Sequence, residues 1–128
     1  MGVILGAFGA HWLENSVQDW GLPVEEQESR LQTWEVAVRY QMYHALAILG
    51  IGMMTARRPS RSLNVAGTLF LVAVLIFSGC LYALVLSGVK VLGAIVPIGG
   101  ASMIAGWVAM AVAAARLRKA PASRASDR

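Results

Sequence analysis

Six polar residues stand in or beside strongly apolar stretches, and these are the positions at which the chain could do chemistry. They are His11, Glu14, Glu35, Arg39, Gln41 and His44. Histidine is the side chain that ordinarily changes charge near neutral pH, so a buried His44 could relay protons, with Gln41 one helical turn before it. The alternative is a neutral histidine that forms a structural hydrogen bond to a neighbouring helix. The lack of a carboxylate beside His44 in the sequence favours this alternative.

Two charged pairs add to this candidate site. His11 and Glu14 are one helical turn apart, and Glu35 precedes Arg39 by four residues, which is the favourable order for an ion pair on a helix. Antiparallel packing of the segments that carry them would bring both pairs to about the same depth. Ionisable residues within a membrane are costly and usually face the interior of a bundle. The sequence therefore predicts a buried polar site that combines these four residues with the histidine and the glutamine.

A proline and two glycines mark a candidate break in the last apolar segment. Pro97 removes one backbone hydrogen bond and disfavours helical geometry at the residue before it, and Gly99 and Gly100 follow closely. In transporters, broken helices of this kind expose backbone groups that bind ions or substrates near the middle of the membrane. The alternative is a packing kink, because prolines and glycines are common in membrane helices.

Other kinds of site find little support. The two histidines, the distant Cys80 and Glu14 show no ligand spacing typical of a metal site, so we expect no metal and no cofactor. Cys80 lies in an apolar run, where burial makes a thiol unreactive. No zinc-protease, nucleophilic-serine or phosphate-loop motif occurs in the chain. We therefore expect that the protein is not an enzyme.

The composition indicates what surrounds these residues. The chain has 128 residues, of which 57% are hydrophobic and only 14% charged, and its mean hydropathy is +0.60. A soluble domain of this size needs more polar surface, so we expect an all-α bundle of four transmembrane helices in the lipid bilayer. A helix of about 20 residues spans the hydrocarbon. The expected spans are 1–13, 34–56, 65–86 and 91–115, which together form one domain over 1–115.

The four segments differ in how well their length and apolar character suit a membrane span. Residues 65–86 and 91–115 contain no charge and are long enough to span on their own. Residues 34–56 include polar side chains and need neighbouring helices to cover them. Residues 1–13 would reach only about 20 Å, which is too short. We expect a membrane helix whose beginning is missing from this chain; a half-span that is hydrogen-bonded within the bundle is the alternative.

The distribution of charge predicts the orientation. Eight of the eleven basic residues follow the second or the fourth segment, on one side of the membrane: Arg57, Arg58, Arg61, Arg116, Arg118, Lys119, Arg124 and Arg128. The positive-inside rule makes that side cytoplasmic, so we expect both termini inside, with 116–128 as a basic tail. Six of the seven acidic residues lie in or beside the first, external connection. The placement of the basic residues, and not the net charge of +4, thus orients the chain. No nucleic acid is expected, because no aromatic residues interleave the basic ones of the tail.

Small residues recur at every fourth position in three of the segments. The stripes are Gly2, Gly6 and Ala10; Gly79, Ala83 and Ser87; and Ala101, Ala105, Ala109 and Ala113. In lipid, such stripes let helices approach closely enough to pack. They predict a compact helical bundle and identify no ligand.

Four motifs, taken in order along the chain, resemble a known family. They are Gly6-Ala7-Phe8-Gly9-Ala10-His11, Trp34 through Tyr40-Gln41-Met42-Tyr43-His44-Ala45-Leu46, Phe77-Ser78-Gly79-Cys80-Leu81-Tyr82, and Pro97-Ile98-Gly99-Gly100 with Gly106-Trp107. Over about residues 2–115 the chain is similar to the YgdD-like family, small bacterial inner-membrane proteins that carry a domain of unknown function. The resemblance implies a four-helix multi-pass membrane protein and implies no activity. Family members usually have more apolar sequence before the first motif, and the long acidic external connection has no family role.

Two functions are compatible with these features. The first is a small accessory or structural protein of the bacterial inner membrane that acts through helix–helix contacts, as a homo-oligomer or with a membrane-protein partner. The second is a carrier or channel for protons or a small solute that uses His44, Gln41 and the break at Pro97. A hydrated cavity at His44 would favour transport, whereas a dry, close-packed interior would favour the accessory role.

Overall fold

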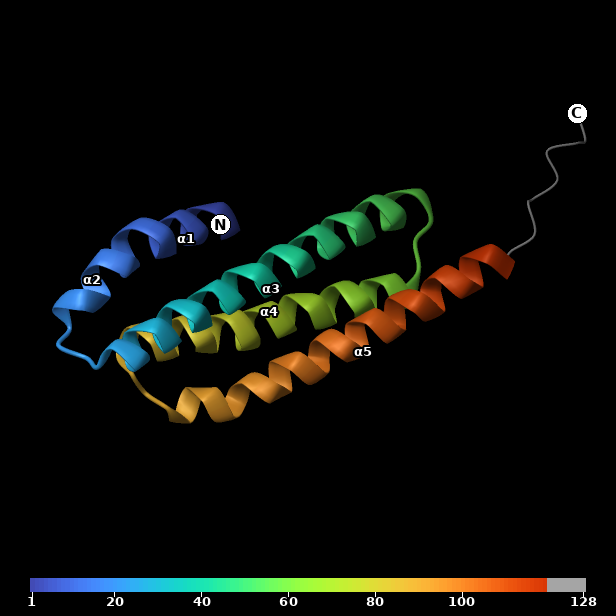
Figure 1. Ribbon diagram of the computed structural model, residues 1–128. Coiled ribbons are helices and arrows are strands. Elements are labelled where there is room, and N and C mark those ends of the chain that lie inside the picture. The colour runs from blue at the N-terminus through green and yellow to red at the C-terminus, as the bar shows by residue number, and fades with distance from the viewer. Residues whose placement is uncertain (120–128) are drawn as a thin grey trace, which may run out of the picture.

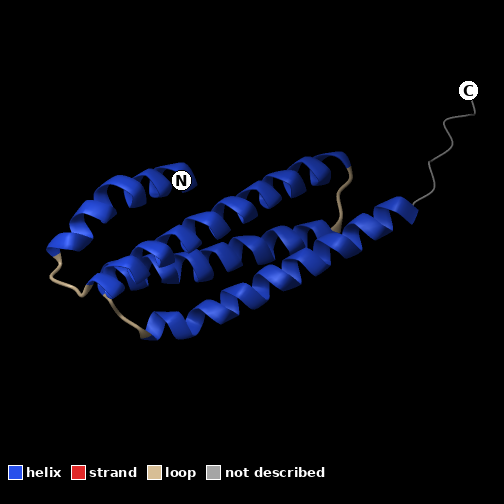
Figure 2. Ribbon diagram, viewed as in Figure 1, coloured by secondary structure: helices blue, strands red, loops and turns tan. Residues whose placement is uncertain are grey.

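The computed structural model describes residues 1–119, with side chains described up to Arg116. In this part of the chain the regular elements are helices: α1 (Gly2–Phe8), the π-helical turn η1 (Gly9–Leu13), α2 (Glu14–Asp19), α3 (Val24–Arg57), α4 (Arg61–Ser87) and α5 (Val91–Lys119). α1, η1 and α2 follow one another without interruption and form one N-terminal rod, so the described chain makes four rods joined by short loops (Figures 1 and 2). The predicted all-α, four-helix bundle is confirmed.

The ends of the rods follow from the local sequence. Pro23 directly precedes α3, and Glu25 and Glu26 in its first turn complement the positive end of the helix. α4 ends at Gly88, whose φ of 72° is the left-handed conformation that glycine adopts at least cost. α3 is one helix of 34 residues, and it therefore includes part of the external connection as well as the expected span 34–56.

α4 is the central helix of the bundle. It packs against α3 and against α5, while α3 and α5 make no close backbone contact within the described residues. The N-terminal rod packs against α3 (Figure 1). α4 and α5 approach closely at Gly99, where a Cβ would lie only 2.7 Å from the backbone nitrogen of Phe77. The absence of a side chain at Gly99 permits this approach.

Glycines also bring the N-terminal rod against α3. A Cβ at Gly9 would collide with the ring of Trp34, and one at Gly2 would collide with the side chain of Met42. Trp34 Nε1 donates a hydrogen bond of 2.9 Å to the carbonyl oxygen of Leu5. These contacts show that the rod and α3 are antiparallel, and that Gly2 of the first small-residue stripe packs within the bundle.

Within residues 1–119, two helices have the length and composition to cross a membrane: α4 and residues Val91–Arg116 of α5. Only 28% and 17% of their most apolar windows are buried within the chain. A core helix of a soluble protein buries most of its apolar surface, so these fractions indicate helices that face lipid. They coincide with the predicted spans 65–86 and 91–115. The predicted spans 1–13 and 34–56 are helical and less uniformly apolar.

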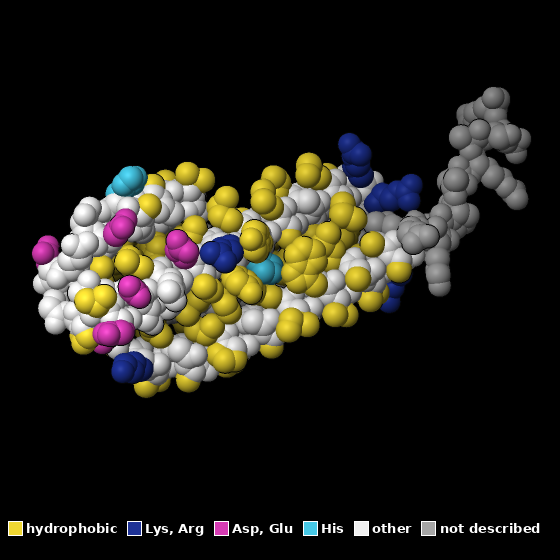
Figure 3. Space-filling view, in the orientation of Figure 1, with side chains coloured by type: hydrophobic (Ala, Val, Ile, Leu, Met, Phe, Trp, Pro, Cys, Tyr) yellow, Lys and Arg dark blue, Asp and Glu magenta, His cyan; other side chains and the backbone are white. Residues whose placement is uncertain are grey.

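Charge is segregated along the bundle (Figure 3). The acidic side chains of the described residues all belong to the stretch 14–35, at the end formed by α2 and the start of α3. Four arginines lie at the opposite end: Arg57, Arg58, Arg61 and Arg116. Of the predicted basic tail, residues 116–119 continue α5, and residues 120–128 lie outside the described residues.

Candidate functional site

His44, on α3, lies in the interior of the bundle and is only 4% exposed. Its Nδ1 is 2.8 Å from the carbonyl oxygen of Tyr40, one turn earlier, and its Nε2 is 3.2 Å from Nε1 of Trp107 on α5. The rings of Phe70 and Trp107 meet the imidazole in edge-to-face geometry, with centroids 5.1 and 6.1 Å away. The hydrogen bond to Trp107 links α3 to α5, two helices whose backbones do not meet.

The partners of His44 determine its tautomer. An indole N–H donates and cannot accept, so Nε2 accepts the bond from Trp107 and the ring proton sits on Nδ1, which donates to the Tyr40 carbonyl. Both ring nitrogens are therefore in use when the imidazole is neutral. A proton on Nε2 would face the N–H of Trp107 and break the link between α3 and α5.

Two further polar contacts join α3 to α4. Tyr82 donates a hydrogen bond of 2.7 Å to Oε1 of Gln41, and Ser78 donates one of 2.9 Å to the carbonyl oxygen of Ala37. Ser78 is fully enclosed, and its hydroxyl would be unsatisfied without this bond. Gln41, like His44, therefore takes part in a contact between two helices.

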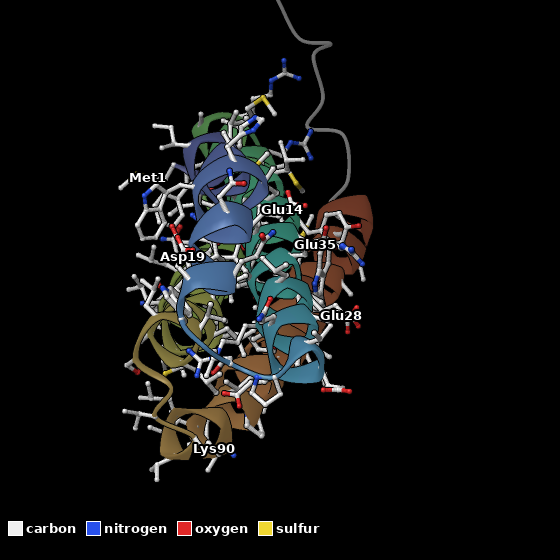
Figure 4. The ribbon with its side chains drawn as sticks, turned by 60° about the vertical axis from the view of Figure 1, so that its left-hand side comes forward. Met1, Glu14, Asp19, Glu28, Glu35 and Lys90 are labelled. Carbon is white, nitrogen blue, oxygen red and sulfur yellow. The ribbon has the colours of Figure 1, made fainter. Side chains whose placement is uncertain are left out.

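The other four residues of the predicted site lie on the surface. Glu14, Glu35 and Arg39 line a cleft of about 490 Å³ between the N-terminal rod and α3, and Figure 4 shows Glu14 and Glu35 at this junction. His11 is exposed and does not line the cleft. Glu35 and Arg39 form the expected pair, but their nitrogen–oxygen distance is 3.5 Å and more than half of each side chain is exposed.

The expectation of one buried polar site is thus corrected to two separate places. His44 is buried in the bundle and Gln41 is half-buried, whereas His11, Glu14, Glu35 and Arg39 are exposed. The reason is that the glycines of the rod pack against α3 around Trp34, so that Glu14, Glu35 and Arg39 line the open cleft beside this contact and do not enter the bundle. The π-helical turn η1 also contains one more residue than an α-helical turn, so the side chains around His11 point in other directions than a continuous α-helix would give them. Within residues 1–119, no group of three His, Cys, Asp or Glu side chains could hold a metal ion.

The predicted helix break at Pro97 is also corrected. α5 is helical from Val91 to Lys119 and contains Pro97 without interruption. One missing backbone N–H is tolerated in a membrane helix, where neighbouring groups and small local adjustments satisfy the freed carbonyl. Gly99 makes the close contact with α4, and a Cβ at Gly100 would meet nothing within 4 Å. Gly99 therefore packs against α4, whereas Gly100, the next residue of the same helix, faces open space.

At the end of the bundle that carries the acidic residues, Arg30 contacts three elements, and the sequence alone predicts few of these contacts. Its guanidinium donates hydrogen bonds of 2.8 Å to the carboxylate of Glu26 and 2.9 Å to the carbonyl oxygen of Val85, and it lies over the ring of Trp20. Only 16% of the side chain is exposed. Arg30 therefore ties the end of the N-terminal rod and the end of α4 to α3. Its fourfold spacing from Glu26 is the single local signal, because Val85 is remote in sequence.

Helices that face lipid and an interior joined by polar contacts define a small α-helical membrane protein. Residues 5–100 match the family described as a protein of unknown function (DUF423), and the chain belongs to this family. It is 45% identical over 113 residues to the UPF0382 membrane protein SAB0533 of Staphylococcus aureus (strain bovine RF122 / ET3-1), covering 88% of this chain and 84% of that protein. It is 37% identical over 117 residues to the UPF0382 membrane protein YwdK of Bacillus subtilis (strain 168), covering 91% and 88%. No solved structure matches the chain.

These relatives are bacterial, and their names describe them as membrane proteins. The comparisons confirm an uncharacterised family of membrane proteins, whereas the YgdD-like name is not confirmed. Neither the family description nor the names of the relatives indicates an enzymatic activity.

Proposed function

We propose that this protein is a four-pass component of the bacterial inner membrane that works through helix–helix contacts with other membrane proteins or with further copies of itself. In this proposal the end that carries the four arginines faces the cytoplasm, as the positive-inside rule requires. The N-terminal rod is antiparallel to α3 and the C-terminal half of α5 runs toward the arginines, which supports both termini on that side.

The observation that carries this proposal is the use of interior polar groups within the bundle. His44, Gln41, Tyr82 and Ser78 each have a hydrogen-bond partner on another helix. Among the buried side-chain oxygens and nitrogens of the described residues, Oγ1 of Thr55 alone lacks a partner. Neither His44 nor Gln41 lines the cleft between the N-terminal rod and α3. Such an interior supports a structural role and leaves interaction to the outer surface.

The outer surface of α4 carries a face suited to helix packing. Gly79, Ala83 and Ser87 are exposed at fourfold spacing, and a Cβ at Gly79 would meet nothing within 4 Å. Small residues at this spacing let membrane helices approach closely. No other helix of the described residues covers Gly79, so this face is free to receive a helix of another molecule.

Gly79→Leu tests this proposal. Leucine would add a bulky side chain to the stripe, and the open space at this position should leave the fold intact. Gly52→Leu is the matched control, because it adds the same side chain to an equally open position on α3. Crosslinking in native membranes and size measurement in a mild detergent should detect a complex for the wild type and for Gly52→Leu, and a smaller particle for Gly79→Leu. A monomer in native membranes, or equal loss of the complex in both variants, would contradict the proposal.

The orientation is tested separately by cysteine labelling. After replacement of Cys80 by Ser, single cysteines at Ser60 and Lys90 place one thiol in each of two loops at opposite ends of α4. A reagent that does not cross the membrane should label position 90 from outside intact cells and position 60 only after the cells are opened. Labelling of both positions from the same side would contradict the proposed crossing of α4.

A second candidate is a carrier or channel for protons or a small solute, and the burial of His44 favours it. An ionisable residue within a membrane is often functional. His44→Gln separates the two functions, because glutamine keeps an acceptor for the Trp107 N–H but cannot bind a proton near neutral pH. A carrier should lose proton flux in reconstituted vesicles on this substitution while its stability is largely retained. Absence of flux for the wild type, with protons and with small solutes, would eliminate this candidate.

A further inference from the structure

Four arginines gather at the end of the bundle opposite the acidic residues (Figure 3). Arg57 ends α3, Arg58 follows it, Arg61 begins α4 and Arg116 lies in the last turns of α5; all four are exposed. Within residues 1–119, every acidic side chain belongs to the stretch 14–35, at the far end of α3. The positive surface formed by these arginines, here called the arginine end, therefore has no carboxylate of the described chain to neutralise it.

A hydrogen bond joins α4 and α5 at the arginine end. Arg116 Nη1 donates to Oγ of Ser62 at 3.3 Å, which holds the last turns of α5 beside the first turn of α4. Ser60, which precedes α4, forms no side-chain cap, so the backbone N–H groups of this turn add their partial positive charge. Positive charge from three parts of the chain thus meets on one surface.

An exposed apolar residue lies one helical turn from an arginine on each of the three helices. These residues are Met53 on α3, Val65 on α4 and Val112 on α5, which are 60%, 52% and 40% exposed and stand four residues from Arg57, Arg61 and Arg116. Residues four apart share one face of a helix. In each pair the arginine is nearer the end of the bundle and the apolar residue is nearer its middle. On each of the three helices, an arginine at the end of the bundle is therefore followed, toward the middle of the bundle, by an exposed apolar side chain.

We propose that the arginine end binds the head groups of anionic phospholipids, whose acyl chains lie along these apolar residues. Guanidinium groups bind phosphate oxygens through paired N–H donors. A single-stranded nucleic acid would require aromatic residues among the basic ones, and residues 57–61 contain none. Free phosphate would make no use of the apolar residue beside each arginine. This inference goes beyond the helix-contact role and does not rest on it.

The test is a titration of the full chain in a neutral detergent, read by native mass spectrometry. Phosphatidylglycerol should bind more tightly than phosphatidylcholine with the same acyl chains. Arg57→Gln, Arg61→Gln and Arg116→Gln should each weaken the binding of phosphatidylglycerol about fivefold, the effect of one basic residue at an anionic surface. Lys90→Gln is the matched control, because it removes an exposed positive charge at the other end of α4 and should leave the affinity unchanged.

Three results would overturn the proposal. They are equal affinity for the two lipids, equal weakening by Lys90→Gln and the arginine variants, and displacement of the lipid by inorganic phosphate at constant ionic strength. The last result would identify a phosphate site in place of a lipid site. The substituted arginines are exposed, so circular dichroism should show unchanged helix content. Arg57→Lys should weaken binding less than Arg57→Gln does, because lysine keeps the charge but not the paired N–H donors.

Discussion

Gly99→Ala probes a close backbone contact between α4 and α5. A Cβ at this position would lie 2.7 Å from the backbone nitrogen and 2.8 Å from the Cβ of Phe77. No rotamer change relieves such contacts, because the atoms belong to the backbone or are attached directly to it. The two helices must therefore move apart, and overpacking of this kind costs about 1–3 kcal/mol. Gly100→Ala is the matched control, since it is the next residue of the same helix and a Cβ there would meet nothing within 4 Å.

Alanine is a better helix former than glycine by about 1 kcal/mol, and both variants share this gain. Their difference therefore isolates the contact with α4. We expect Gly99→Ala to be less stable than Gly100→Ala by about 1–3 kcal/mol. Thermal unfolding in a mild detergent, followed by circular dichroism, measures this difference. Equal stability of the two variants would refute the close packing and the assignment of Gly99 as a packing position.

Three further predictions concern the polar contacts. His44→Ala should lower the free energy of unfolding by about 2 kcal/mol or more, because it leaves the Trp107 N–H unpaired and opens a cavity; His44→Gln should lower it less. Tyr82→Phe removes one hydrogen bond to α3 and should cost about 1 kcal/mol in the same unfolding assay. Arg30→Gln should cost about 1–3 kcal/mol, whereas Arg39→Gln should cost less than about 0.5 kcal/mol because its ion pair is exposed.

Each of these predictions has an outcome that contradicts it. Equal losses for the alanine and glutamine variants at His44 would show that its contact with α5 contributes nothing beyond volume. Tyr82→Phe with unchanged stability would mean that its hydroxyl is equally well satisfied elsewhere. Equal effects of Arg30→Gln and Arg39→Gln would remove the distinction between a guanidinium that joins three elements and one that forms a surface pair.

The helices of this fold could be predicted because a helix that spans the lipid must consist almost entirely of apolar residues. Residues 65–86 and 91–115 lie within α4 and α5, since an uncharged stretch of that length has few other stable states. The start of α3 at Val24 also has local signals, because Pro23 suits the beginning of a helix and Glu25 and Glu26 complement its first turn. The contacts of Arg30 with Trp20 and Val85, which hold these turns in place, have no such signal. At Pro97 the candidate break is absent and α5 continues, because the rest of the helix is held by its neighbours.

The candidate site was less predictable because its partners are remote in sequence. The cost of polar side chains in lipid predicted that Gln41 and His44 face the interior of the bundle, where the structure buries His44 and half-buries Gln41. Their partners Tyr82 and Trp107 are 41 and 63 residues away, and no local pattern relates them. His11 was misplaced for a different reason, since the π-helical turn that contains it has no clear signature in residue type. The assignment of any activity to these residues stays a prediction.

The central position of α4 has a consequence for biogenesis. Each helix packs against the one that precedes it in the chain, and the loops at 58–60 and 88–90 are short. As the chain enters the bilayer, each new helix can therefore pack at once against the helix synthesised just before it, without waiting for a partner from a later part of the chain. The hydrogen bond between Trp107 and His44 is the exception, because it joins α3 to α5, which are separated in the chain by α4. This hydrogen bond can form only after α5 has been synthesised, when all the helices of the bundle are present.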